Sequence, residues 1–329
     1  MRVAVTGGGG FLGSHLCEAL LRRGDSVVCL DNFSTSDPTN IAHLVSDPSF
    51  VLQHTDVSVS VEVAGGVDAV AHLASPASPP DYPRQPLETL AVGSRGTENT
   101  LRLALRHDAR FVLASTSEIY GDATTVPLTE ESPAAPTNPY AGTKWTCEQV
   151  LADLCRRVPD LRVLALRYFN PAGAHPTGLL GEDPRGVPNN IMPFLAQVAV
   201  GRRAELKVFG DDYPTPDGTG VRDYIHVADV ADGHRGALDH IDDEPGMRVF
   251  NLGTGRGASV LELVRTFEQV SGRAVPHRVA ASRPGDVAEL VADPAKAAAA
   301  WGWSARHDLA AMCRDAWTFQ QQNAYGYAP

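Results

Sequence analysis

Short apolar runs alternate with longer segments of helical apolar spacing through the first half of the chain. The apolar runs predict strands at Arg2–Thr6, Ser26–Leu30, Ala69–Leu73, Arg110–Ser115 and Arg162–Arg167. The segments between them predict helices at Leu12–Arg23, Leu87–His107 and Tyr140–Arg157. Because strands that alternate with helices pair in parallel and are covered on both faces, we expect a doubly wound α/β fold of the Rossmann type.

The pattern changes after Asn170. Loops rich in glycine and proline follow, and they flank a helix predicted at Ile191–Arg202. We therefore expect two domains. Residues 1–172 form the doubly wound domain, and residues 173–329 form a smaller α/β domain that closes over a ligand, with some later segments returning to the first domain.

The turn after the first predicted strand carries glycines spaced G-x-x-G-x-x-G, at Gly7, Gly10 and Gly13. Without Cβ atoms, the chain there can turn tightly, approach a pyrophosphate and pack the next helix against the strand. Phe11 and Leu12 begin that helix, whose N-terminal N–H groups favour negative charge. A strand before the turn and a helix after it favour a dinucleotide site over an ordinary turn.

Asp31 ends the second predicted strand, about 20 residues beyond the glycines, and Asn32 follows it. An acid at this position accepts hydrogen bonds from the adenosine ribose and repels a 2′-phosphate, which favours NAD over NADP. Asp56 and Val57 follow a further short strand before Ala69, where they either contact the adenine or form a simple turn.

Tyr140 and Lys144 are spaced i, i+4 on a predicted helix, which puts both side chains on one face. A nearby ammonium stabilises a phenolate and lowers the tyrosine pKa, so that the phenol can act as a general base. The same spacing also describes an ordinary surface pair. A second feature supports the catalytic interpretation, because the strand ending at Ser115 leads into Thr116, and a hydroxyl there is expected in the crevice at the carboxyl end of a parallel sheet.

The segments TGGGGFLG, STSEIYG and YAGTK together resemble the extended short-chain dehydrogenase/reductase family. In the second half, LRYFNPAGAHPTG, VFGDDYPTPDGTGVRDYIHVADVADGH and FNLGTGRGASVLELV closely resemble bacterial UDP-glucose 4-epimerases, and the similarity spans nearly the whole chain. The resemblance implies an NAD-dependent enzyme that epimerises a UDP-hexose, UDP-glucose or UDP-galactose, through a transient 4-keto sugar. It also implies a homodimer.

The resemblance further implies roles for individual residues. Tyr140 is the expected acid/base at the sugar 4-hydroxyl, Lys144 binds the nicotinamide ribose, and Thr116 takes the position of the catalytic serine or threonine. The expected substrate contacts are Asn170 and Asn190 at the diphosphate and sugar, Arg222 and Arg283 at the diphosphate, Phe209 at the uracil, Asp286 at the ribose, and Ser117, Glu118 and Leu290 near the sugar.

Some segments differ from typical UDP-glucose 4-epimerases. Residues 72–82 and 113–122 resemble UDP-glucuronate decarboxylases more, and small residues stand around Ala77 where many epimerases have a lysine. Gly93 stands where an asparagine is expected, and Glu118 either acts near the sugar or caps the following turn. Leu290, at the position that gates sugar size, is neither as bulky as tyrosine nor small. The alternatives are therefore a UDP-glucuronate decarboxylase or 4-epimerase, an epimerase of another nucleotide sugar in a secondary-metabolite pathway, and a non-catalytic NAD-sensing protein.

Composition and charge limit the classes of partner that the protein is expected to bind. The net charge of −11 over 329 residues leaves no basic stripe for nucleic acid. The five cysteines are scattered and odd in number, which predicts reduced core thiols and no disulfide framework. No apolar run approaches the ~20 residues of a membrane span, and no cluster has metal-ligand spacing. We expect a cytoplasmic protein that binds neither a membrane nor a metal.

Overall fold

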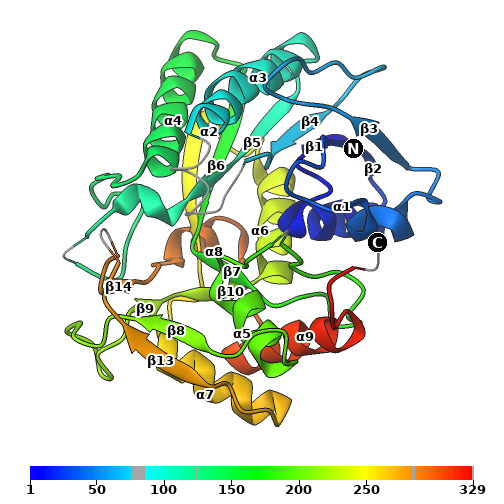
Figure 1. Ribbon diagram of the computed structural model, residues 1–329. Coiled ribbons are helices and arrows are strands. Elements are labelled where there is room, and N and C mark those ends of the chain that lie inside the picture. The colour runs from blue at the N-terminus through cyan, green and yellow to red at the C-terminus, as the bar shows by residue number, and fades with distance from the viewer. Residues whose placement is uncertain (76–85, 124, 185, 284–285, 328–329) are drawn as a thin grey trace. The chain divides into compact units, whose positions relative to one another are not determined.

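The computed structural model in Figure 1 describes residues 1–75, 86–123, 125–184, 186–283 and 286–327. The chain forms two compact units, each assembled from three segments. The first unit contains Met1–Ile119, Asn138–Arg167 and Ala231–Phe250, and the second contains Tyr120–Thr137, Tyr168–Val230 and Asn251–Pro329.

The first unit is built on a seven-stranded sheet in the order β11-β6-β5-β4-β1-β2-β3. Strand β1 pairs in parallel with β2 and β4, β2 pairs in parallel with β3, and β4 pairs in parallel with β5. This sheet confirms the doubly wound α/β fold. Its strands are β1 (Arg2–Thr6), β2 (Ser26–Asp31), β3 (Phe50–His54), β4 (Ala69–His72), β5 (Arg110–Thr116), β6 (Arg162–Tyr168) and β11 (Gly246–Leu252).

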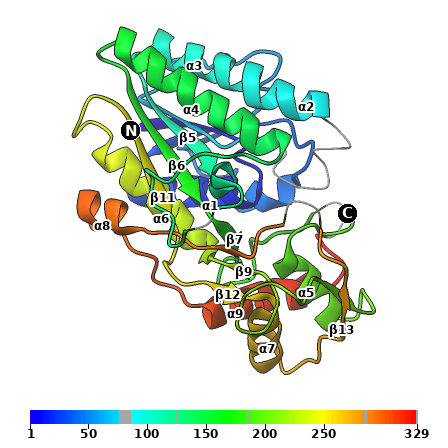
Figure 2. The same ribbon diagram turned by 90° about the vertical axis from the view of Figure 1, so that its left-hand side faces the viewer.

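Helices cover both faces of this sheet. Figure 2 shows α3 (Thr97–Arg106) and α4 (Pro139–Arg157) over one face, and α1 (Phe11–Arg23) and α6 (Val227–His240) over the other. The helix predicted at 87–107 is one helical run, in which α2 (Pro86–Ala91) continues through a π-helical turn at Val92–Gly96 into α3. Apolar side chains of α3, α4 and the sheet form one core, which includes Leu30, Leu103, Phe111, Leu113 and Leu151.

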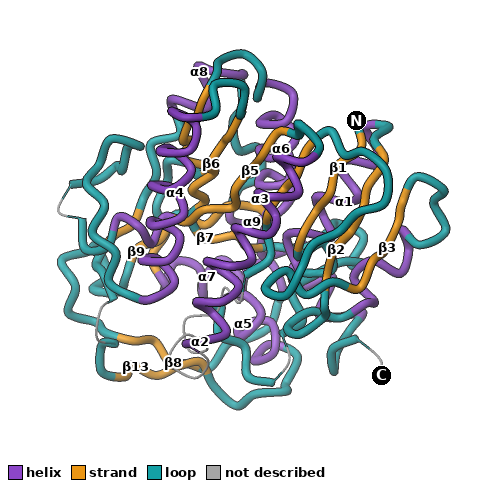
Figure 3. Tube along the Cα trace, turned by 90° about the horizontal axis from the view of Figure 1, so that it is seen from above, coloured by secondary structure: helices purple, strands orange, loops and turns teal. Residues whose placement is uncertain are grey.

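The second unit combines small sheets with a group of packed helices. Figure 3 shows β8 (Leu206–Phe209) paired with β13 (His277–Ala280). Strand β7 (Asn170–Ala172) pairs with β10 (Tyr224–His226), and β9 (Val221–Arg222) lies between β12 (Ala258–Ser259) and β14 (Glu289–Leu290). The helices α5 (Ile191–Ala199), α7 (Val260–Ser271) and α9 (Leu309–Gln322) share a second apolar core.

One helix end differs from the sequence expectation. The helix predicted at 191–202 ends at Ala199. Gly201 has φ +87°, a left-handed conformation that stops a helix, and the N–H of Arg202 donates to the carbonyl of Gln197. The remaining helices are two 3₁₀ turns at Pro38–Leu44 and Ser117–Tyr120, and α8 at Ala295–Trp301.

All five cysteines are buried and are free thiols. Among the described residues, no helix is long and apolar enough to span a membrane.

Candidate functional site

The glycine-rich turn joins β1 to α1 with very little space for side chains. Gly7 has φ +68°, and its N–H donates to the carbonyl of Leu30 on β2 at 2.8 Å. A Cβ at Gly7 would lie 2.9 Å from the backbone of Ala74, and one at Gly13 would overlap the carbonyl oxygen of Gly7. Glycine is therefore required at both positions for α1 to start directly behind β1.

The N-terminus of α1 presents unpaired backbone donors. Gly10 is the N-cap residue and has an extended backbone, and no side chain caps the helix among the described residues. The first N–H groups, beginning with those of Phe11 and Leu12, have no acceptor within the helix. Chain neighbours aside, the Gly7 carbonyl is the one group among the described residues within 4 Å of the position of a Cβ on Gly10. This turn has the shape and the donors to hold a phosphate or pyrophosphate group.

Asp31 links the glycine turn to the end of β2. One carboxylate oxygen accepts the N–H of Gly9 at 2.8 Å, and the other accepts the N–H of Phe33 at 2.7 Å and the hydroxyl of Ser36 at 3.2 Å. A carboxylate offers about four acceptor positions, so these bonds fix its orientation and leave capacity for a ribose hydroxyl. The structure thus places Asp31 beside the turn, as the sequence predicted for a dinucleotide site.

Asp56 forms a local turn and contacts the residue after Asp31. One of its carboxylate oxygens accepts both the N–H and the hydroxyl of Ser58, and these bonds lower the pKa of Asp56. Its other oxygen accepts the side-chain amide of Asn32 at 3.2 Å. The carbonyl of Val57 accepts the side-chain amide of Asn99 on α3. The structure therefore shows the turn that was one of the two interpretations of Asp56. A contact with adenine stays a prediction.

Tyr140 and Lys144 lie on the first turns of α4 and are both buried. Tyr140 is 7% exposed and Lys144 is 2% exposed. The Lys144 ammonium lies 5.8 Å from the centroid of the Tyr140 ring. Burial lowers the pKa of Lys144, and Cys147 and Glu148 oppose that shift. Both side chains are therefore largely shielded from water. The alternative interpretation, an ordinary surface pair, is wrong.

The end of β5 is tied to the start of α4. The Thr116 hydroxyl, buried at 6% exposure, accepts the N–H of Glu118 at 3.2 Å. A Glu118 carboxylate oxygen accepts the side-chain amide of Asn138 at 2.6 Å, and the amide oxygen of Asn138 caps α4 by accepting the N–H of Ala141 at 2.9 Å. Glu118 therefore acts on the cap of the helix that carries Tyr140. Ser117 is buried beside it, at 2% exposure.

A buried ion pair fixes α4 against the sheet one turn beyond Lys144. The Glu148 carboxylate accepts a hydrogen bond from the Ser115 hydroxyl on β5. It also accepts two from the Arg167 guanidinium on β6, at 3.0 and 2.5 Å. Glu148 is 1% exposed and Arg167 is 4% exposed. Sequence reasoning missed this pair, because nothing in the spacing of Glu148 and Arg167 marks them as partners.

In the second unit, several of the predicted nucleotide contacts lie together. The Arg283 guanidinium carbon lies 3.7 Å from the centroid of the Phe209 ring, at the end of β8. The N–H of Asp286 donates to the carbonyl of Arg283 at 3.1 Å, so these two residues lie close together. Arg222 on β9 donates to the carbonyl of Val221 at 2.8 Å. An aromatic ring stacked with a cation forms a flat platform suited to a base or a diphosphate.

Asn170 and Asn190 also lie in the second unit. The side-chain oxygen of Asn170 is buried and has no hydrogen-bond partner among the described residues. Asn190 begins α5, but its amide donates to Glu182 at 2.6 Å and does not cap the helix.

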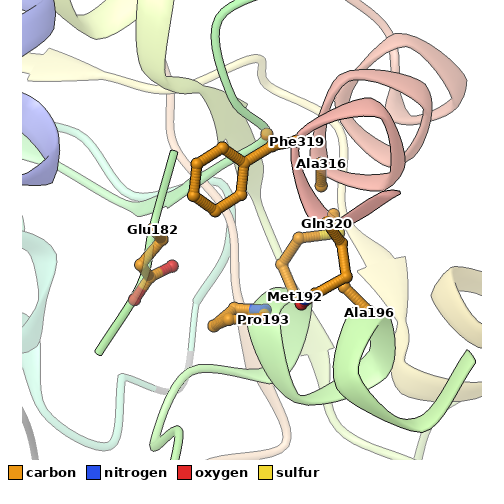
Figure 4. Close-up of a pocket in the computed structure, with 8 residues that line it drawn as sticks. Glu182, Met192, Pro193, Ala196, Ala316, Phe319 and Gln320 are labelled. Atoms are coloured by element: carbon orange, nitrogen blue, oxygen red, sulfur yellow. The ribbon is translucent and has the colours of Figure 1, made fainter. Parts of the chain in front are cut away.

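Glu182 faces an apolar pocket (Figure 4), and burial raises its pKa to about 7. The pocket is lined by Gly173, Glu182, Met192, Pro193, Ala196, Ala316, Phe319 and Gln320.

A family model for NAD dependent epimerases and dehydratases matches residues 3–253. The chain belongs to the NAD dependent epimerase/dehydratase family. A UDP-glucose 4-epimerase of Bacillus subtilis is 44% identical over 99% of both chains, and one of Dictyostelium discoideum is 43% identical over 99% of this chain and 98% of its own.

Solved structures extend the similarity to three dimensions. UDP-glucose 4-epimerase from Bifidobacterium longum, in complex with NAD⁺ and UDP, has a TM-score of 0.94 at 38% identity, over 99% of this chain and all of that one. The enzyme from Stenotrophomonas maltophila, with bound NAD and formylated UDP-arabinopyranose, has a TM-score of 0.94 at 41% identity, over 98% of this chain and 99% of that one. The predicted resemblance to the extended short-chain dehydrogenase/reductase family and its UDP-glucose 4-epimerases is confirmed.

Two positions at which the sequence departs from typical UDP-glucose 4-epimerases, Gly93 and Leu290, can be located in the structure. A Cβ at Gly93 would overlap the Thr143 side chain on α4, and the Gly93 carbonyl accepts the Cys147 thiol at 3.0 Å. An asparagine would not fit this close approach of the π turn to α4. Leu290 is 7% exposed and packs with Tyr120 and other buried apolar residues. The segment around Ala77 lies outside the described residues.

Proposed function

We propose that the protein catalyses the NAD-dependent 4-epimerisation of a UDP-hexose and interconverts UDP-glucose and UDP-galactose. The observation that carries this proposal is the buried Tyr140 and Lys144 pair, 5.8 Å from ring centroid to ammonium, on a helix whose start is tied to the end of β5. Relatives that are 40–44% identical over 99% of this chain and bear the name UDP-glucose 4-epimerase support the substrate.

The residues around the glycine turn fit NAD. The Gly7–Gly13 turn leaves room for a pyrophosphate, and the N–H groups of Phe11 and Leu12 would donate to it. Asp31 would accept a ribose hydroxyl, and Asn32, Asp56 and Val57 would lie near the adenine. Bound there, NAD would supply the hydride acceptor and donor for the chemistry at C4 of the sugar.

Tyr140 is the proposed acid and base of the reaction. Its phenolic oxygen would take the proton of the sugar 4-hydroxyl and later return it, and the Lys144 ammonium would favour the phenolate. The Glu148 carboxylate opposes the pKa lowering that burial imposes on Lys144 and so favours its ammonium form. The Thr116 hydroxyl would hydrogen-bond to the sugar oxygen at C4 and orient it, with Ser117 and Glu118 beside it.

Residues of the second unit are the proposed binding contacts for the UDP group. Arg222 and Arg283 would bind the diphosphate, because guanidinium groups match its oxygens and carry the opposite charge. Phe209 would stack on the uracil and Asp286 would accept the ribose hydroxyls. Asn170, whose buried amide oxygen has no partner among the described residues, would accept from a sugar hydroxyl. Asn190 and Leu290 complete the expected set of substrate contacts.

We infer a homodimer formed through α2 and α4. Leu87 and Leu90 on α2 are 74% and 51% exposed, and Val150 on α4 is 56% exposed. Three large apolar side chains on neighbouring helices are better explained by a partner helix pair than by contact with water. Sedimentation at micromolar concentration should report a dimer, and Leu87→Glu should shift it to a monomer.

The buried free cysteines suit the reducing cytoplasm, where we place the protein.

Proton NMR of UDP-glucose incubated with the purified protein, without added NADH, tests the function. We expect UDP-galactose to accumulate to equilibrium, and Tyr140→Phe to lower the rate by roughly 10²–10⁴-fold because the general base is lost. Parallel incubations contain UDP-N-acetylglucosamine, UDP-glucuronate and GDP-mannose. Turnover of one of these with none of UDP-glucose would overturn the substrate and leave the roles of Tyr140 and Lys144 standing.

A further inference from the structure

Tyr213 lies in the loop between β8 and β9, and its ring packs against Gly210, the residue after Phe209. A Cβ on Gly210 would lie 2.5 Å from the Tyr213 ring and 3.3 Å from Cβ of Ser282. The ring therefore covers Gly210, the residue after Phe209, and Ser282 beside it precedes Arg283. The N–H of Tyr213 donates to the carbonyl of Gly218 at 3.0 Å, which closes the loop that carries the ring.

The hydroxyl oxygen at the end of this ring is buried and has no hydrogen-bond partner among the described residues. A buried phenolic hydroxyl normally finds an acceptor, because leaving it unpaired after removal from water is unfavourable. Such a hydroxyl on this ring thus points to an acceptor that a ligand supplies.

The charges around Tyr213 indicate what that acceptor is. Burial raises the pKa of Tyr213, as do Asp286 and Asp212, while Arg222 and Arg283 lower it. The net effect keeps the phenol protonated, and therefore a hydrogen-bond donor, at neutral pH. A group that attracts two guanidinium ions and accepts a hydrogen bond from a phenol is an anionic oxygen.

We propose that Tyr213 is a further substrate-binding residue that donates its phenolic hydrogen to a diphosphate oxygen of the bound nucleotide sugar. The inference rests on the proposed function, because it takes a nucleoside diphosphate as the ligand. Tyr213 adds a neutral, directional donor to the two cations. It fixes the orientation of the diphosphate, which two long flexible arginine side chains do less well.

Calorimetric titration of the purified protein with UDP tests this role. Tyr213→Phe keeps the ring that covers Gly210 and removes only the hydroxyl. We expect its Kd for UDP to rise about tenfold, which corresponds to about 1.4 kcal/mol. The matched control, Tyr325→Phe, changes a tyrosine that is 88% exposed, and its Kd should equal that of the parent. Titration with uridine, which has no phosphate, should give the same Kd for the parent and Tyr213→Phe.

Steady-state rates with UDP-glucose give a second readout. A role in binding predicts that Tyr213→Phe raises KM and changes kcat by less than about twofold. A Kd for UDP within twofold of the parent would overturn the inference, and so would an equal loss for uridine, which would place the hydroxyl at the nucleoside. A parent protein that does not bind UDP at all would instead overturn the proposed function, and the inference with it.

Discussion

The buried pair of Glu148 and Arg167 gives a direct test of how the helix that carries Tyr140 is held. Glu148→Gln keeps the size of the side chain and one acceptor for the Ser115 hydroxyl, and it removes the negative charge. The Arg167 guanidinium, 4% exposed, would then lie in the core without the carboxylate that neutralises it. The variant therefore measures the charge interaction separately from packing.

The structure sets the size of the expected effect. Breaking a buried ion pair costs about 3–5 kcal/mol, because the remaining charge has lost both water and its partner. Glutamine keeps part of the hydrogen bonding, so we expect the lower end, about 3 kcal/mol. A domain of this size loses about 2–4 °C of Tm per kcal/mol, which gives a fall of roughly 10 °C.

Thermal unfolding followed by circular dichroism provides the assay. The control is Glu98→Gln, which breaks an exposed pair with Arg102 at 2.7 Å on α3 and should change stability by less than about 0.5 kcal/mol. Adding Arg167→Met to Glu148→Gln also removes the buried positive charge, so the double variant should be more stable than the single one. If Glu148→Gln lowers Tm no more than Glu98→Gln does, the reasoning is refuted.

Three further predictions concern other parts of the fold. Gly13→Ala places a Cβ on the Gly7 carbonyl and should abolish NAD binding measured by fluorescence titration, whereas Gly142→Ala, with open space around its Cβ, should bind NAD normally and unfold at a slightly higher temperature. Asn138→Ala removes the side-chain cap of α4 and should cost about 1 kcal/mol in urea unfolding; an unchanged midpoint would contradict this role. The pKa of Glu182 is raised by burial from 4.5 to about 7, so its contribution to stability is full below pH 4.5 and is lost as the pH rises through 7. Glu182→Gln should therefore flatten the fall in urea midpoint between pH 5 and 8, and a parallel fall in parent and variant would exclude this group.

Local patterns in the sequence predicted the elements of the first unit well. The strands at Arg2–Thr6 and Ser26–Leu30 agree with β1 and β2 to within one residue, because buried parallel strands are short continuous apolar runs. The helix of Tyr140 was predicted from apolar spacing, and its start one residue earlier reflects Pro139 at the first helical position. Asn138 before that proline is an N-cap signal that could have been recognised from sequence.

The contacts that hold the site could not be predicted in the same way. Glu148 and Arg167 are 19 residues apart on different elements. The sequence does not distinguish Tyr213 from other loop tyrosines, because its distinguishing feature is a buried hydroxyl without a hydrogen-bond partner among the described residues. Such features depend on how distant segments pack, and no local propensity encodes that packing. The roles of Asn170 and Arg283 came from resemblance to a family, and the geometry adds a physical reason for each of them.

Two of the departures from the family pattern, at Glu118 and Gly93, involve the helix that carries Tyr140. Glu118 binds the residue that caps α4, and Gly93 lets the π turn approach Thr143 on the same helix. Both therefore act on where α4 begins and how closely it packs, and neither by itself argues for a different reaction. A general base must be held within a fraction of an ångström of its working position, and a helix fixed at its cap and along its length does this better than a loop. The Thr-Ser-Glu strand end can thus be understood as a different way to anchor the helix of the proposed base, Tyr140.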